Sequence, residues 1–128
     1  MVEPLAALPA SVRKTRLRVH YLEFRFGSSR AGKGLDRCGT LNARLILGES
    51  ITALVKLLFL VKRSWPSTRH WSTEELELLG VGPDLIAAIE GVLLSPEKAR
   101  LQALAKEADR FLEGQGETFH KNGQKLMQ

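Results

Sequence analysis

Apolar residues recur at steps of three and four along most of this chain, which is the spacing of one face of an α-helix. We predict a central helix from residue 37 to Arg63, with apolar positions at Leu41, Leu45, Ile51, Leu54, Val55, Leu58 and Phe59. Its last third also contains Leu57, Leu60 and Val61, so it is apolar nearly all round and is expected to be buried on several sides. Pro66 is expected to stop it, because proline lacks an amide donor and disfavours helical geometry in the preceding residue.

Three shorter helices are predicted after this proline. Ser72 and Glu75 have the spacing of a capping box and start a short helix that ends at Gly80. Residues 82–84 start the next helix, which carries Leu85, Ile86, Ile89, Val92 and Leu93. Residues 95–97 start the last one, with Pro96 in its first turn. That last helix has an apolar face of Leu101, Leu104, Ala105, Ala108, Phe111 and Leu112.

The segment before the central helix is ambiguous. Leu17, Tyr21 and Phe24 fit a helical face, whereas residues 17–21 also alternate like a strand. We predict a helix over 16–26, because the chain offers no comparable second strand for it to pair with. Residues 27–36 are rich in glycine and are predicted to form a loop.

The pattern therefore predicts an all-α protein, an antiparallel bundle of about five helices. Its length of 128 residues suits one domain. We expect the bundle to occupy residues 11–113, between a flexible lead-in at 1–10 and a polar tail at 114–128.

Composition narrows the classes of function. The net charge of +5 favours acidic partners, so nucleic acid is a possible partner. One cysteine and three scattered histidines have no metal-ligand spacing, so neither a metal nor a cofactor is expected. The longest apolar run, residues 54–61, is far shorter than the roughly 20 residues that span a bilayer, and the N-terminus does not resemble a secretory signal. We therefore expect a cytoplasmic protein without a membrane helix.

The glycine-rich segment Gly27–Gly34 lacks the features of two phosphate-handling motifs. A P-loop requires serine or threonine directly after its lysine, whereas Gly34 follows Lys33. A nucleotidyltransferase requires two aspartates one residue apart to hold magnesium, whereas Asp36 is the only acid nearby. An ordinary loop is the simpler interpretation.

Arg63 and His70 have the spacing used by HEPN-type ribonucleases. In such a site the histidine exchanges protons with the ribose hydroxyl and the arginine stabilises the phosphate charge. Pro66 lies between them and places them across a loop. The alternative is that Trp65 and Trp71 anchor this loop while the arginine stays solvated.

Gly80, Val81 and Gly82 resemble the turn of a helix-hairpin-helix DNA-binding motif, whose backbone amides contact a DNA phosphate without reading sequence. Ile86 stands where the motif has a small residue, and several flanking acids would repel phosphate. A glycine-containing turn between two helices explains the same residues.

The segment Ala53–Trp71 resembles part of the helical C-terminal domain of DUF4037-like or kanamycin-nucleotidyltransferase-like nucleotidyltransferases, a bundle related to the HEPN group. There a buried helix leads into an Asn-Arg-aromatic-x-Pro stretch and a basic-Trp pair; here Lys62-Arg63-Ser64-Trp65-Pro66 and His70-Trp71 stand at those places. Lys62 replaces the asparagine and His70 the basic residue. The similarity in layout covers roughly residues 12–113.

This resemblance implies a non-catalytic accessory or substrate-binding bundle. Its partner would be a nucleotidyltransferase catalytic chain, and a homodimer is the alternative assembly. The chain lacks the catalytic half itself, so we do not expect it to be an enzyme alone. The alternatives are a metal-independent ribonuclease that uses Arg63 and His70, and a DNA-binding protein that uses Gly80–Gly82.

Overall fold

The computed structural model describes residues 3–4, 9–36, 40–62, 64–65 and 73–116. Its five helices are α1 (Ala10–Asp36), α2 (Thr40–Val61), α3 (Thr73–Leu78), α4 (Pro83–Leu94) and α5 (Lys98–Gly114). Two short strands, β1 (Glu3–Pro4) and β2 (Ser64–Trp65), pair antiparallel with Glu3 opposite Trp65. The protein is thus an all-α helical bundle, as the hydrophobic pattern predicts, and residues 16–26 are helical within α1.

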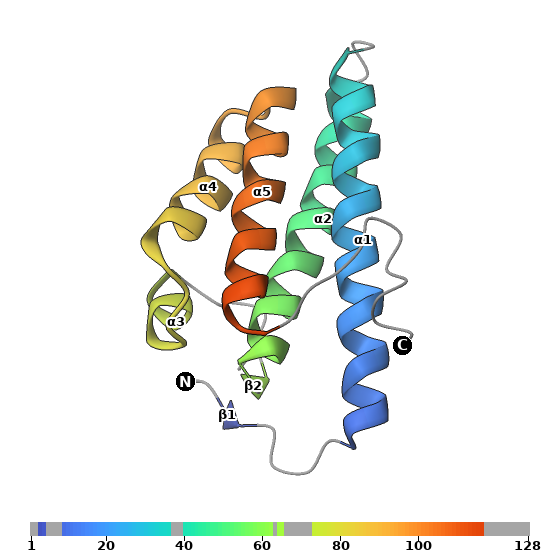
Figure 1. Cartoon of the computed structure of the whole chain (residues 1–128). Helices are drawn as coiled ribbons and strands as arrows, with labels where there is room; N and C mark the ends of the chain where they lie inside the picture. The colour runs from blue at the N-terminus through green and yellow to red at the C-terminus, as the bar shows by residue number, and fades with distance from the viewer. Residues whose placement is uncertain (1–2, 5–8, 37–39, 63, 66–72, 117–128) are drawn as a thin grey trace.

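The bundle consists of two helical hairpins (Figure 1). The long helices α1 and α2 run side by side, and α4 and α5 form a second, shorter hairpin that packs beside them. One contiguous apolar core joins both hairpins. Its largest fully buried side chains include Tyr21, Phe24, Phe59, Leu104 and Leu112.

The predicted loop at 27–36 is wrong, because these residues continue α1 to Asp36. Their glycines serve a close approach between helices. A Cβ added at Gly27 would lie 2.8 Å from the Cβ of Ser50, and one added at Gly34 would lie 2.9 Å from the Cβ of Ala43. Neither distance leaves room for a side chain. The glycines let α1 and α2 pack backbone against backbone at the cost of weaker helix propensity.

In each of α1 and α2, one series of buried residues follows the alternating four- and three-residue steps of coiled-coil packing. The series is Leu17, Tyr21, Phe24, Ser28 and Ala31 in α1, and Ala43, Leu47, Ser50, Leu54, Leu57 and Val61 in α2, while further residues of α2 are buried outside it. Ser50 is 1% exposed and donates a hydrogen bond of 2.7 Å to the carbonyl of Phe24. The hydroxyl of Ser28 lies 2.9 Å from that of Ser50 and acts as the donor, because the Ser50 proton is already used.

The central helix is largely as predicted. Every residue from 53 to 61 is buried except Lys56. However, two of its predicted apolar positions are exposed, Leu41 by 74% and Leu45 by 62%. Ala43 and Leu47 occupy the core side of this first part of α2 instead. The predicted end at Arg63 lies outside the described residues, and α2 ends at Val61.

The last two helices, α4 and α5, agree with the predicted hydrophobic pattern except at one exposed leucine and at the start of α5. α4 begins at Pro83 directly after Gly82, and the predicted apolar faces of α4 and α5 lie in or against the core, with Leu93 exposed as the exception. α5 begins at Lys98, so Pro96 precedes the N-cap residue Glu97 and is not in the first turn. The predicted cap Ser72 lies outside the described residues.

Candidate functional site

The two residues of the ribonuclease hypothesis, Arg63 and His70, both lie outside the described residues. Lys62 is the last described residue of the preceding segment, and its ammonium donates a hydrogen bond of 3.2 Å to the side-chain carbonyl of Gln115. The ribonuclease alternative therefore stays a prediction from the sequence.

The turn Gly80–Gly82 does connect two helices, α3 and α4. Gly80 has a φ of +85°, which favours glycine. The amide of Gly80 donates to the carbonyl of Glu77 at 2.9 Å, and the amide of Val81 donates to that of Leu76 at 3.1 Å. Val81 is 3% exposed. These two amides therefore cap the C-terminal end of α3. Because they are already hydrogen-bonded, the DNA-binding alternative would depend on the amides from Gly82 onward for its contact with phosphate.

A second feature is the side of α1 and α2 that faces away from the α4–α5 hairpin, which we call the outer face. On α1 it presents Val12, Val19 and Phe26, which are exposed by 39%, 43% and 54% and stand seven residues apart. Seven residues make almost two helical turns, so the three side chains form one stripe. On α2 the exposed Leu41 and Leu45 extend the apolar surface.

Two adjoining cavities hollow the outer face. One, of about 400 Å³, lies between Phe26, Val19 and Ile46, and the other, of about 630 Å³, extends past Leu45 and Gly48. Both are lined by Glu23 and Glu49, so they form one groove along the hairpin. Gly48 lines the second cavity, and no atom lies within 4 Å of the position that a Cβ there would take, so the groove is open at this point.

Charge on the outer face alternates along α1. Arg16, Glu23 and Arg30 are exposed and stand seven residues apart, which is the same spacing as in the apolar stripe.

His20 lies beside these charged residues. Its Nδ1 is 3.7 Å from a carboxylate oxygen of Glu23, which is too long for a hydrogen bond. Burial lowers the pKa of His20 below 6.5, and the cations Lys56 and Arg16 act in the same direction, while Glu23 opposes them.

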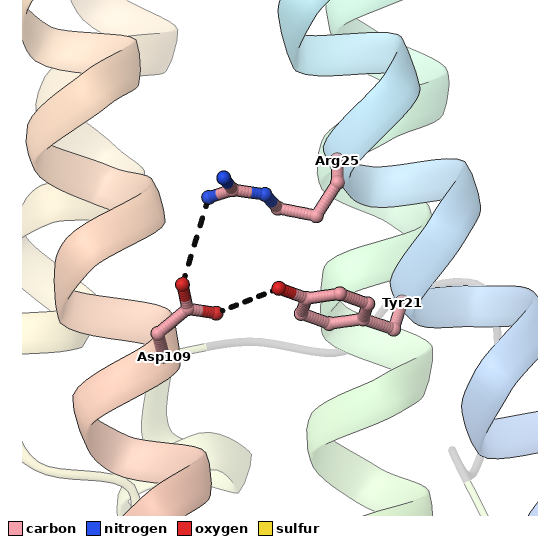
Figure 2. A network of polar contacts seen from close by, with 3 residues as sticks. All are labelled: Tyr21, Arg25 and Asp109. Carbon is pink, nitrogen blue, oxygen red and sulfur yellow. Dashed lines mark hydrogen bonds and ion pairs between the residues drawn. The ribbon is translucent and has the colours of Figure 1, made fainter. Parts of the chain in front are cut away.

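The opposite side of α1 is tied to α5 by a polar cluster that Figure 2 shows. The hydroxyl of Tyr21 donates a hydrogen bond of 3.1 Å to one carboxylate oxygen of Asp109, and the guanidinium of Arg25 lies 3.7 Å from the other. Burial and the charge of Asp109 raise the pKa of Tyr21 to about 12, although Arg25 lowers it. This cluster fixes α5 against α1.

Within the described part of the chain, no three histidine, cysteine, aspartate or glutamate side chains gather in a way that could hold a metal ion. None of the described helices is long and apolar enough to cross a membrane.

Sequence reasoning did not find the outer face. The signal was present as the seven-residue spacing of Val12, Val19 and Phe26, but a stripe of this kind cannot be distinguished from a core face by periodicity alone. The structure makes the distinction, because Leu17, Tyr21 and Phe24 occupy the core face of the same helix.

Comparisons with protein-family profiles, with curated proteins and with solved structures return no match for this chain.

Proposed function

We propose that this chain is a non-catalytic helical accessory domain that acts with a nucleotidyltransferase catalytic domain on another chain. The resemblance of Ala53–Trp71 to the helical half of such enzymes suggests the partner. The observation that carries the proposal is the outer face, because an exposed apolar stripe beside a groove is a feature of protein-binding surfaces.

The groove suits a partner helix. Helix-in-groove recognition uses apolar anchors at helical spacing, and the stripe of Val12, Val19 and Phe26 offers three contact points over two heptads. Phe26 is the largest of them and is 54% exposed beside a cavity of about 400 Å³. Large aromatic side chains in such positions contribute much of the binding energy of an interface.

The charge pattern specifies the chemistry of that partner helix. Arg16, Glu23 and Arg30 present positive, negative and positive charge in turn beside the apolar stripe. A helix with acidic, basic and acidic side chains at the same seven-residue spacing would complement all three. The catalytic chain is therefore expected to present an amphipathic helix with this pattern.

The test is co-expression of this chain with each nucleotidyltransferase catalytic chain encoded in its source genome, followed by size-exclusion chromatography with light scattering. We expect one of them to form a stable 1:1 complex. Phe26→Asp should weaken that complex by at least about tenfold, which is about 1.4 kcal/mol, because it places a charge in an apolar contact.

Leu94→Asp is the matched control, since Leu94 is 85% exposed at the end of α4, away from the outer face. It should leave the complex intact. Absence of any complex, or a complex that survives Phe26→Asp, would refute the proposal. A homodimer that Phe26→Asp dissociates would also refute it, because the face would then belong to a second copy of this chain.

A further inference from the structure

Charge is distributed unevenly between the two halves of the bundle. The helices α1 and α2 contain nine lysine and arginine residues and three acidic ones. The helices α3 and α4 contain five acidic residues and no basic one, while α5 has four basic and three acidic residues. The complete sequence shows the same division, because residues 1–72 have thirteen basic and four acidic residues and residues 73–128 have six and ten.

The fold converts this division into a direction in space. In Figure 1, α3 and α4 lie on the opposite side of α5 from α1 and α2. Four of the five acidic residues of α3 and α4 are exposed, namely Glu74, Glu77, Asp84 and Glu90. The molecule therefore has a negative side at α3 and α4 and a positive side at α1 and α2, which carries the outer face.

The charges nearest the outer face have the sign of the positive side. Its two cavities are lined by three exposed cations, Arg30, Arg44 and Lys56, and by two carboxylates, Glu23 and Glu49. The potential outside a protein surface is a sum over all nearby charges, so it does not depend on their meeting at one point. The rest of α1 and α2 adds further positive charge, and the acidic side chains of α3 and α4 are remote from this surface.

The composition of the outer face favours an acidic protein over nucleic acid. A phosphate backbone is bound mainly through lysine and arginine. Glu23 and Glu49 line both cavities of the groove and would repel it. The exposed stripe of Val12, Val19 and Phe26 has no counterpart on a phosphate backbone, whereas apolar anchors and aromatic side chains are common where two proteins meet.

We propose that the outer face selects a partner helix that is acidic overall, through the charge separation between the two sides of the bundle. The inference rests on the proposed docking of a helix at this face, and it adds the charge that surrounds the contact. Electrostatic complementarity of this kind raises the rate of association and suppresses wrong partners. The acidic side at α3 and α4 repels the same helix, which favours its approach to the outer face.

The test compares two labelled helical peptides with the full chain by fluorescence anisotropy. Both have leucine anchors and the contact pattern of glutamate, lysine and glutamate at seven-residue spacing. Their remaining exposed positions are glutamate in one peptide and lysine in the other. We expect the acidic peptide to bind at least tenfold more tightly in 0.1 M salt, where charges interact over about 10 Å, and less than threefold more tightly in 1 M salt, where they interact over about 3 Å.

Equal affinity of the two peptides in 0.1 M salt would overturn the inference, and so would a preference that 1 M salt does not reduce. Displacement of the acidic peptide by duplex DNA in 0.1 M salt would also overturn it, because the face would then suit nucleic acid. If neither peptide binds, the outer face does not select an acidic helix and the inference fails.

Variants locate the source of the preference. Arg30→Gln combined with Arg44→Gln should reduce the preference for the acidic peptide by about threefold or more. The matched control combines Lys106→Gln with Arg110→Gln, which removes the same charge from exposed positions of α5 outside both cavities, and it should change the preference by less than twofold. An equal reduction in both variants would contradict a role for the outer face.

Two further results separate this inference from the proposed function. Phe26→Asp should weaken the binding of both peptides, and unchanged binding would place them elsewhere and overturn the inference. If no nucleotidyltransferase chain forms a complex but the acidic peptide is preferred, the proposed function fails and the inference stands. If a complex forms and the two peptides bind equally, the inference alone fails.

Discussion

Tyr21 is the residue whose surroundings are most clearly defined. It is 1% exposed and contacts Asp109 across the two hairpins, and it is the only tyrosine of the chain. Absorbance at 295 nm, which reports tyrosinate, therefore follows this one side chain. We expect its titration midpoint near pH 12, where an exposed tyrosine would give about 10.

The raised pKa of Tyr21 also makes the folded protein less stable at high pH. Above pH 10 the unfolded chain releases the tyrosine proton more readily than the folded chain, so stability is lost as the pH rises from 10 through about 12. Asp109→Asn should lower the midpoint but keep it above 10, because burial is the larger cause. A wild-type midpoint near 10 with the helical circular dichroism signal intact would contradict this account.

His20 predicts a second dependence of stability on pH, in acid. Above pH 6.5 it is neutral in both states and contributes nothing. Below that value the unfolded chain takes up the proton more readily, because burial, Lys56 and Arg16 lower the pKa in the folded state. Stability should therefore fall as the pH decreases from 6.5 toward the folded-state pKa.

Urea denaturation at pH 7.5 and pH 5.5 measures this effect. The free energy of unfolding should decrease more in the wild type than in His20→Gln. His70 and His120 are present in both proteins, so the difference isolates His20. An equal decrease in both proteins would show that His20 is not the cause.

At the scale of elements, replacing a glycine by alanine is expected to stabilise the protein at one position and to destabilise it at another. Gly48→Ala meets no atom within 4 Å, so it should stabilise the protein by about 0.5–1 kcal/mol through helix propensity. Gly34→Ala places a Cβ 2.9 Å from the Cβ of Ala43 and should destabilise by roughly 1–3 kcal/mol. Thermal unfolding followed by circular dichroism measures both.

A double substitution tests whether the contact between positions 34 and 43 causes this loss of stability. Gly34→Ala combined with Ala43→Gly moves the methyl group from one helix to the other, so most of the lost stability should return. If the double variant is as unstable as the sum of the single ones, the clash between α1 and α2 is not the reason for the loss.

These glycines also show where sequence reasoning fails. Periodicity predicted the helical segment 16–26, the buried end of α2 and both helices of the second hairpin, because each has an apolar face of its own. It failed at 27–36, because a glycine that permits close helix packing cannot be distinguished locally from a glycine that forms a turn. The difference depends on Ser50 and Ala43, which lie on the other helix.

At the scale of the whole molecule, α1 serves three separate surfaces. One side packs against α2, a second carries the outer face, and a third contacts α5 through Tyr21 and Arg25. Only the first of these surfaces is buried and mainly apolar, which is why the hydrophobic pattern predicted the bundle but not the outer face.

The contact of Gly27 and Gly34 with Ser50 and Ala43 also has an evolutionary consequence. Positions 34 and 43 share space for a single methyl group, so a lineage can acquire a side chain at one position only if it loses one at the other. The same holds for 27 and 50, with the added requirement that the hydroxyl of Ser50 still reaches the carbonyl of Phe24. Related sequences should therefore change these positions in pairs, and such paired changes would identify relatives of this chain even where overall similarity has been lost.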